Sequence, residues 1–271
     1  MKIALLLLVG FGLPMARAQE VSLLSFPPAQ HMTRAELWFA RTVKTPKAVL
    51  VLCPGMNGSG KSLVRDPRWQ AFAKKNQLGL VGLSFASKNS DLFSGHDYTY
   101  PEEGSGELLL QGIEEYYGKA LPLFLYGFSS GAFFTEMMVN WHPSQVLAWC
   151  AHGTGRYEEN PRPWPPGIVS CGEQDHSRYG ASLMHFKKGR AAGSKLLWVS
   201  LPENGHDWPG ELHAFVREYF EAVLRQSPSP LWVDIDSEKV LNEKEARHQP
   251  SLSGWLPSDQ LVEPWKKLHQ P

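Results

Sequence analysis

A serine in a glycine-framed turn is the first candidate for chemistry in this sequence. Residues 127–131 read Gly-Phe-Ser-Ser-Gly, a G-x-S-x-G pentapeptide centred on Ser129. An apolar run at 121–126 precedes it, and a segment with apolar residues at helical spacing follows it to Trp141. Strand, tight turn and helix form the setting in which a serine hydroxyl is exposed as a nucleophile. We interpret Ser129 as a residue that attacks a carbonyl carbon.

A serine hydroxyl is a poor nucleophile at neutral pH, so it needs a base and a group that orients the base. His206 follows a predicted strand over 195–201, and Asp175 follows one over 167–171. In open sheets of parallel strands, ligands bind just outside the carboxyl ends of the strands. Of the ten histidines, only His206 combines this place with the chain order serine, acid, histidine. We predict His206 as the base and Asp175 as the acid.

Two other carboxylates compete with Asp175 for the role of the acid. Glu173 lies nearer to the end of its strand, but its side chain is longer and harder to fix in one position. Asp207 adjoins His206 in sequence and would need an unusual backbone to reach the same imidazole. Asp175 is therefore our assignment, with Glu173 and Asp207 as rivals.

A glycine-rich loop after the predicted strand 48–53 has two possible uses. It begins Pro54-Gly55-Met56, which is well placed to offer a backbone N–H to a developing oxyanion. The residue after the nucleophile, Ser130, would offer the second N–H. We predict Met56 and Ser130 as the oxyanion-hole residues.

Residues 55–62 also spell a phosphate-binding P-loop, G-x-x-x-x-G-K-S, after a strand. A P-loop needs a helix that starts at its Lys-Ser pair. Pro67 follows Ser62 by only five residues and would break such a helix, and Asp66 before it is pushed out of helical conformation. The pair Asp66-Pro67 instead predicts the cap and first residue of a separate helix. We therefore favour the oxyanion role for this loop.

The chain alternates predicted strands and helices, which indicates an α/β fold with a mostly parallel central sheet and helices on both faces. Strands are predicted at 36–43, 48–53, 78–85, 121–126, 146–151, 167–171 and 195–201, and helices at 66–76, 105–117, 130–141, 177–192 and 211–225.

Both ends of the chain differ from this pattern. Residues 1–18 have the form of a signal peptide: Lys2, an apolar core over 3–11 and an A-x-A cleavage site at 16–18. We expect a secreted or periplasmic protein whose α/β domain covers 19–226. Ser-Pro-Ser-Pro at 227–230 marks a boundary, and we expect a polar C-terminal tail over 227–271. Two alternatives stay open for this tail: it packs on the domain surface through its isolated Trp232, Trp255 and Trp265, or it is partly disordered.

Composition limits the partners. The 27 basic and 27 acidic residues cancel, which gives no indication of nucleic acid or of an anionic membrane as a partner. We expect no membrane span, since the apolar run at the N-terminus is too short to cross a bilayer.

Cys150 and Cys171 end successive predicted strands, but buried free thiols are expected rather than a disulfide.

With these residues in place, the chain resembles the α/β-hydrolase superfamily over about 37–225. Within it, the esterase and dienelactone-hydrolase-like branch is most similar, including secreted feruloyl esterases and polyhydroxybutyrate depolymerases. The resemblance rests on Pro54-Gly55-Met56, the pentapeptide around Ser129, Asp175 and Gly205-His206. This chain has Pro54-Gly55 where the family's loop often begins His-Gly.

The resemblance implies an exported serine esterase that cleaves a small-molecule or polymer-linked ester, with no metal or organic cofactor. A serine peptidase uses the same three residues and stays open. Two alternatives belong to other classes: a non-catalytic α/β-hydrolase scaffold that binds a partner, and a P-loop nucleotide binder at 55–62. The sequence carries no indication of the oligomeric state.

Overall fold

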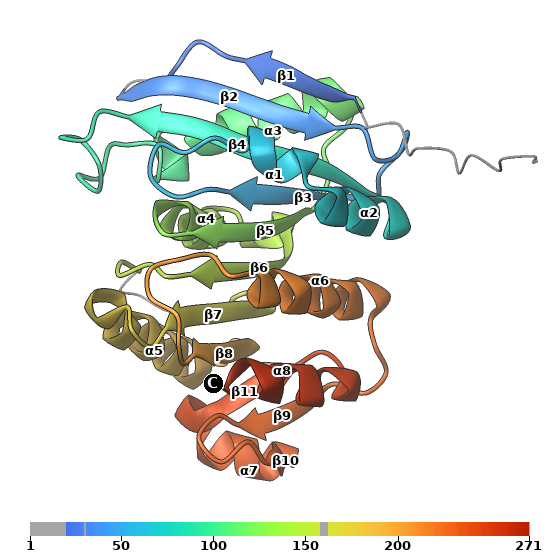
Figure 1. Ribbon diagram of the computed structural model, residues 1–271, viewed down its shortest axis with the longest axis vertical. Helices are drawn as coiled ribbons and strands as arrows, with labels where there is room; N and C mark the ends of the chain where they lie inside the picture. The colour runs from blue at the N-terminus through green and yellow to red at the C-terminus, as the bar shows by residue number, and fades with distance from the viewer. Residues whose placement is uncertain (1–19, 30, 158–161, 271) are drawn as a thin grey trace, which may run out of the picture.

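The computed structural model describes residues 20–29, 31–157 and 162–270, and the expected signal peptide, residues 1–18, lies outside them. Eight strands form one sheet in the order β1-β2-β4-β3-β5-β6-β7-β8 (Figure 1). Only the pairs β1–β2 and β2–β4 are antiparallel. The strands are β1 (Val21–Ser25), β2 (Met32–Ala40), β3 (Ala48–Cys53), β4 (Leu78–Ser87), β5 (Leu123–Phe128), β6 (Val146–His152), β7 (Gly167–Gly172) and β8 (Leu196–Leu201).

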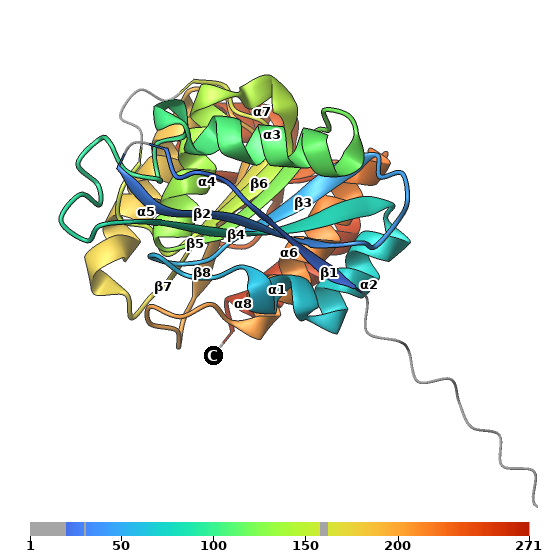
Figure 2. The same ribbon diagram turned by 90° about the horizontal axis from the view of Figure 1, so that it is seen from above.

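Helices cover both faces of this sheet, as the sequence predicts. Helices α3 and α4 lie on one face, and α1, α2 and α6 lie on the other (Figure 2). Every residue of β3, β4 and β8 is buried, because a parallel sheet between two helical layers has no solvent-facing side. The helices are α1 (Lys61–Arg65), α2 (Pro67–Lys75), α3 (Ser105–Tyr117), α4 (Ser130–Trp141), α5 (His176–Ala191) and α6 (Gly210–Arg225).

The first strands differ from the prediction. The strand expected at 36–43 begins at Met32 and ends at Ala40, so both of its predicted ends are wrong. Edge strand β1 is absent from the predicted strands. It has five residues, and none of them is fully buried, so its sequence lacks the continuous apolar run of the central strands.

Residues 227–270, which we call the C-terminal segment, are folded, although their composition suggests a polar tail. They form a second sheet in the order β10-β9-β11, together with helices α7 and α8, beside strand β8 (Figure 1). The elements are β9 (Leu231–Asp234), β10 (Val240–Leu241), α7 (Glu243–His248), β11 (Ser253–Leu256) and α8 (Val262–Leu268).

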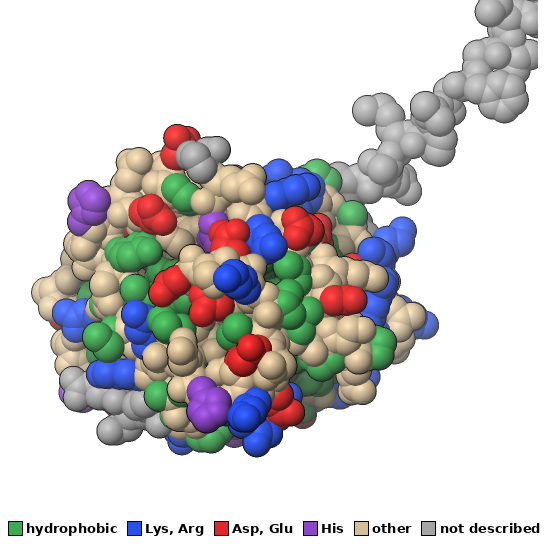
Figure 3. Space-filling view, turned by 90° about the horizontal axis from the view of Figure 1, so that it is seen from below, with side chains coloured by type: hydrophobic (Ala, Val, Ile, Leu, Met, Phe, Trp, Pro, Cys, Tyr) green, Lys and Arg blue, Asp and Glu red, His purple; other side chains and the backbone are tan. Residues whose placement is uncertain are grey.

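Tryptophans and one arginine attach the C-terminal segment to the main sheet. Trp265 is fully buried, and its indole N–H donates to the carbonyl oxygen of Trp198 in β8 at 2.9 Å. Arg190 of α5 lies over the ring of Trp232, 4.1 Å from its centroid. Figure 3 views this end of the molecule, where acidic and basic side chains alternate with hydrophobic ones. The polar composition therefore belongs to an outer surface, whereas Trp255 and Trp265 are buried and Trp232 is half-buried.

The cysteines Cys53, Cys150 and Cys171 are buried free thiols, as the sequence predicts. Burial raises the pKa of the Cys53 and Cys171 thiols to about 12 and raises that of Cys150 further still. A thiol reacts as its thiolate, so these cysteines are inert as nucleophiles at neutral pH.

Candidate active site

Ser129 occupies a sharp turn between β5 and α4. Its backbone has φ 56° and ψ −122°, a region that non-glycine residues rarely adopt. The Ser129 N–H donates to the carbonyl oxygen of His152 at 2.9 Å, which ties the turn to the end of β6. Strained backbone of this kind persists only where the surrounding structure holds it. The strand–turn–helix setting expected from the sequence is therefore present.

Two glycines allow strand β5 and helix α4 to pack closely at this turn. A Cβ on Gly127 would lie 2.1 Å from the carbonyl oxygen of Gly131, and one on Gly131 would lie 2.2 Å from that of Cys53. Neither position has room for a side chain. The G-x-S-x-G spacing is thus a packing requirement of the turn.

The structure brings Ser129, His206 and Asp175 into one hydrogen-bonded chain. The His206 Nε2 atom lies 3.0 Å from Ser129 Oγ, and Nδ1 lies 2.7 Å from Asp175 Oδ2. In this arrangement Nδ1–H donates to the carboxylate, which leaves Nε2 free to accept the serine proton. The three residues come from the ends of β5, β7 and β8, which lie at one edge of the sheet.

Asp175 is nearly inaccessible, since 3% of its side chain is exposed. Its second oxygen, Oδ1, accepts hydrogen bonds from Arg178 Nη1 at 3.0 Å and from Ser177 Oγ at 3.1 Å. Burial by itself raises the pKa of this carboxyl, but the hydrogen bonds of Arg178 and His206 outweigh that effect and hold the pKa below its usual value. Asp175 therefore stays ionised where it faces the imidazole.

The two rival carboxylates bind other partners. Glu173 Oε1 accepts from Ser200 Oγ at 2.6 Å, and Asp207 Oδ2 accepts from the Asn204 amide at 3.0 Å. Asp175 is therefore the carboxylate in the hydrogen-bonded chain.

His152, which the sequence did not single out, contacts both the Ser129 turn and the segment next to His206. Its own carbonyl holds the Ser129 N–H, and its Nε2 lies 2.8 Å from the carbonyl oxygen of Asp207, next to His206. Its Nδ1 lies 2.9 Å from Ser170 Oγ. Burial lowers the pKa of His152 to about 4, so the ring is neutral. A polar residue at the carboxyl end of β6 was the signal that could have found it.

The predicted oxyanion residues, Met56 and Ser130, border the same cavity as Ser129. Tyr98 links the segments that carry them. The phenol donates to Ser130 Oγ at 3.0 Å and accepts the N–H of Asn57, the residue after Met56, at 3.3 Å. Burial raises the pKa of Tyr98, so it remains a donor. Tyr98 was not predicted from the sequence, since it lies in a long loop far along the chain.

The glycines of loop 55–62 serve packing. A Cβ on Gly60 would lie 2.2 Å from the backbone of Gly82 in β4, and a Cβ on Gly58 would lie 2.8 Å from the carbonyl oxygen of Gly55. Several N–H groups of the loop are already used: Gly58 donates to Gly55, and Gly60 donates to Ser84 Oγ at 3.0 Å. They are therefore not free to cradle a phosphate.

Helix α1 does begin at Lys61, although the sequence predicted no helix there. It ends at Arg65, and α2 begins at Pro67 with Asp66 as its cap, as predicted. Lys61 extends over the ring of Trp38, 4.5 Å from its centroid. The start of α1 at Lys61 is what a P-loop requires, but the paired N–H groups of the loop and the position of Lys61 over Trp38 disagree with phosphate binding.

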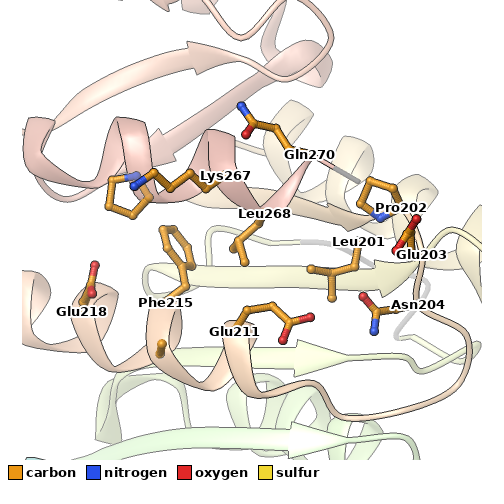
Figure 4. Close-up of a pocket in the computed structure, with 12 residues that line it drawn as sticks. Leu201, Pro202, Glu203, Asn204, Glu211, Phe215, Glu218, Lys267, Leu268 and Gln270 are labelled. Atoms are coloured by element: carbon orange, nitrogen blue, oxygen red, sulfur yellow. The ribbon is translucent and has the colours of Figure 1, made fainter.

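A cavity of about 300 Å³ opens beside the serine. It is lined by Met56, Phe93, Ser129, Ser130, Thr154, Gly155, Arg156, Ser177 and Arg178. A larger cavity of about 460 Å³ lies between β8, α6 and α8 (Figure 4). Asn204 borders it, but Ser129, Asp175 and His206 do not. The smaller cavity is therefore the candidate substrate site.

Residues 20–29, 31–157 and 162–270 contain no group of three or more histidine, cysteine or carboxylate side chains arranged to hold a metal ion. None of the helices in this part of the chain has both the length and the apolar character that crossing a bilayer requires.

Comparison with known proteins gives structural neighbours but no sequence relatives. No protein-family model matches the chain, and no curated protein is similar to it in sequence. Acylaminoacyl peptidase of Pyrococcus horikoshii is similar over 78% of this chain at 11% identity and TM-score 0.58. This chain spans only 42% of that peptidase.

Two smaller proteins align over most of their length. LpqC, a poly(3-hydroxybutyrate) depolymerase from Bordetella parapertussis, has 14% identity and TM-score 0.55, over 85% of this chain and 94% of its own. The carboxylesterase EstE1, cloned from a metagenomic library, has 11% identity and TM-score 0.54, over 76% of this chain and 88% of its own. At such identities the likeness concerns the fold. The eight-stranded, mostly parallel sheet and the helices around it give this chain the α/β-hydrolase fold.

Proposed function

We propose that this chain is an exported serine hydrolase that cleaves carboxylic esters through an acyl-enzyme. The observation that carries the proposal is the hydrogen-bonded chain from Ser129 Oγ through His206 to the buried carboxylate of Asp175. An inactive scaffold would have no need to keep a strained serine within 3.0 Å of an imidazole nitrogen.

The proposed reaction assigns each of these residues a role. Ser129 Oγ forms a bond to the ester carbonyl carbon while its proton moves to His206 Nε2. Asp175 holds the ring in the required tautomer and stabilises the imidazolium. The N–H groups of Met56 and Ser130 hydrogen-bond the oxyanion, each contributing about 3 kcal/mol.

Collapse of the tetrahedral intermediate breaks the ester C–O bond, and His206 gives its proton to the departing alkoxide. Water then attacks the acyl group on Ser129, with His206 again taking a proton. The bond between the acyl carbon and Ser129 Oγ then breaks, Oγ takes the proton back from His206, and the carboxylic acid leaves.

The small size of the cavity favours esters over peptides as substrates. About 300 Å³ beside Ser129 suits a small acyl or alcohol group. Carboxylesterase EstE1 and the depolymerase LpqC also align over most of their lengths, whereas the peptidase aligns over less than half of its own.

A fluorophosphonate probe and a panel of p-nitrophenyl esters with matched anilides test the proposal. We expect the wild type to be labelled and to hydrolyse esters, and Ser129→Ala to lose both properties while keeping its melting temperature. Ser90→Ala, in an exposed loop, is the matched control and should retain both. Labelling that survives in Ser129→Ala would refute the assignment, and faster turnover of anilides than of esters would favour a peptidase.

Export is part of the proposal and rests on Lys2, the apolar run at 3–11 and the A-x-A site at 16–18. N-terminal sequencing of protein from a host with a secretory pathway should begin at Gln19. A mature chain that retains residues 1–18 would contradict export by this signal.

A further inference from the structure

The cavity beside Ser129 has a positive lining. Among the described residues that line it, Arg156 and Arg178 are ionisable, and no carboxylate borders it. This excess of positive side chains at the cavity contrasts with the whole chain, in which 27 basic and 27 acidic residues cancel. The charge therefore lies where the substrate would bind.

Arg178 already has two hydrogen-bond partners, both bound by the same nitrogen. Its Nη1 donates to Asp175 Oδ1 at 3.0 Å and to Ser177 Oγ at 3.0 Å, and about a third of its side chain is exposed. A guanidinium has five N–H donors in a planar fork, and Nη1 carries only two of them. Arg178 can therefore hold Asp175 with one side of the fork and present the other to the cavity.

Arg156 lies in the loop after β6 and is exposed. Its guanidinium lies over the ring of Phe93, 4.8 Å from the centroid, and its Nη1 lies 3.4 Å from the Phe93 carbonyl oxygen. Stacking on an aromatic face fixes the plane of the guanidinium and leaves the N–H groups at its edge free to bind a ligand. Phe93 and Arg156 both line the cavity, so the fixed charge borders the space next to Ser129.

We propose that the preferred substrates are esters that carry a carboxylate a few bonds from the scissile carbonyl, bound by Arg156 and Arg178. The inference rests on the proposed ester hydrolysis and names its substrate class. The fork of an arginine matches the two oxygens of a carboxylate, and a partly enclosed site screens the pair less than open solvent does. The same contact would select against esters with neutral or cationic groups at this position.

The experiment compares mono-p-nitrophenyl adipate with its methyl ester, which differ only in the free carboxylate. We expect kcat/KM for the anionic ester to exceed that for the neutral one by about tenfold or more. The preference should shrink between 0.1 M and 1 M salt, where the screening length falls from about 10 Å to about 3 Å.

Variants of Arg156 test its part in the preference. Arg156→Gln should lower the ratio of the two kcat/KM values by about tenfold, and Arg156→Lys should restore part of it. Arg247→Gln removes an exposed charge on α7 and is the matched control, with an unchanged ratio expected. An anionic-to-neutral ratio near one, or a ratio that Arg156→Gln does not move, would overturn the inference. Absence of turnover with both esters, together with absence of fluorophosphonate labelling, would instead overturn the proposed ester hydrolysis.

Discussion

Tyr98→Phe is the change that tests how the oxyanion residues are held. The phenol is buried, with 4% of the residue exposed, and its hydroxyl bridges Ser130 Oγ and the Asn57 N–H. Removing the hydroxyl leaves the ring in place but leaves both groups without this partner. An unsatisfied buried polar group costs about 1–3 kcal/mol. One contact is 3.3 Å long and only part-buried, so we expect the free energy of unfolding to fall by about 2 kcal/mol.

The effect on catalysis is separate from this loss of stability. Complete loss of one oxyanion donor lowers kcat about 10²- to 10³-fold. Tyr98 supports the donors without touching the oxyanion, so a smaller displacement is expected. We predict a drop in kcat of about tenfold, equivalent to about 1.4 kcal/mol of barrier, with little change in KM.

Steady-state kinetics with a p-nitrophenyl ester and a thermal melt measure the two effects. Tyr179→Phe is the control, because it also removes a tyrosine–serine hydrogen bond, to Ser200 at 3.1 Å, but away from the cavity. It should lower the melting temperature and leave kcat within about twofold. If Tyr98→Phe lowers the melting temperature but not kcat, the bridge does not position the donors and the reasoning is refuted.

Three further predictions concern the acid, the packing of the glycine-rich loop and acid stability. Asp175→Asn should lower kcat about 10⁴-fold and Asp207→Asn far less; the reverse order in ester kinetics would move the acid to Asp207. Gly82→Ala places a Cβ 2.4 Å from the Gly60 carbonyl oxygen and should lower the midpoint of urea unfolding. The control is Gly180→Ala, in open space on α5, which should leave the free energy of unfolding unchanged or raise it by up to about 1 kcal/mol. Equal midpoints for the two variants would contradict the packing role of Gly82. Since the folded pKa of His152 is about 4 and the unfolded value about 6.5, the unfolded chain binds the extra proton between these pH values, and His152 should contribute about 3 kcal/mol to the fall in stability from pH 6.5 to 4. Burial lowers the pKa of His185 to about 3 and that of His213 to about 4, so the contribution of His152 is measured as the difference between urea titrations of the wild type and of His152→Gln, and equal pH dependence in the two would refute its neutral, buried state.

The sequence predicted the parts of the site that are determined by residues close to one another along the chain. Apolar runs located the central strands, and residues just past their ends were placed together because the carboxyl ends of parallel strands share one edge. For this reason His206 and Asp175 could be selected from chain order and strand ends once the G-x-S-x-G pentapeptide had indicated Ser129. Strand β3 and helix α3 have the predicted bounds, because burial on both faces and an amphipathic pattern leave little ambiguity.

The remaining features depend on contacts between distant segments. Tyr98 reaches Ser130 across 32 positions of the chain, and no local pattern records that pairing. Gly60 faces Gly82 for the same reason, so a packing contact produced a literal match to a phosphate-binding motif. The fold of the C-terminal segment could not be chosen over a disordered tail from the sequence, because its indoles are isolated there and Trp265 becomes buried only against β8.

The attachment of the C-terminal segment to β8 also bears on the order in which the protein folds. Strand β8 is the last strand of the main sheet, and an uncovered edge offers unpaired N–H and C=O groups to other chains. Trp265 of α8 supplies a donor to the backbone of that strand. During synthesis the edge therefore stays open until α8 (Val262–Leu268) has left the ribosome. A chain that terminates before α8 would have the strand ends that carry Ser129, Asp175 and His206 but an uncovered edge, which favours aggregation.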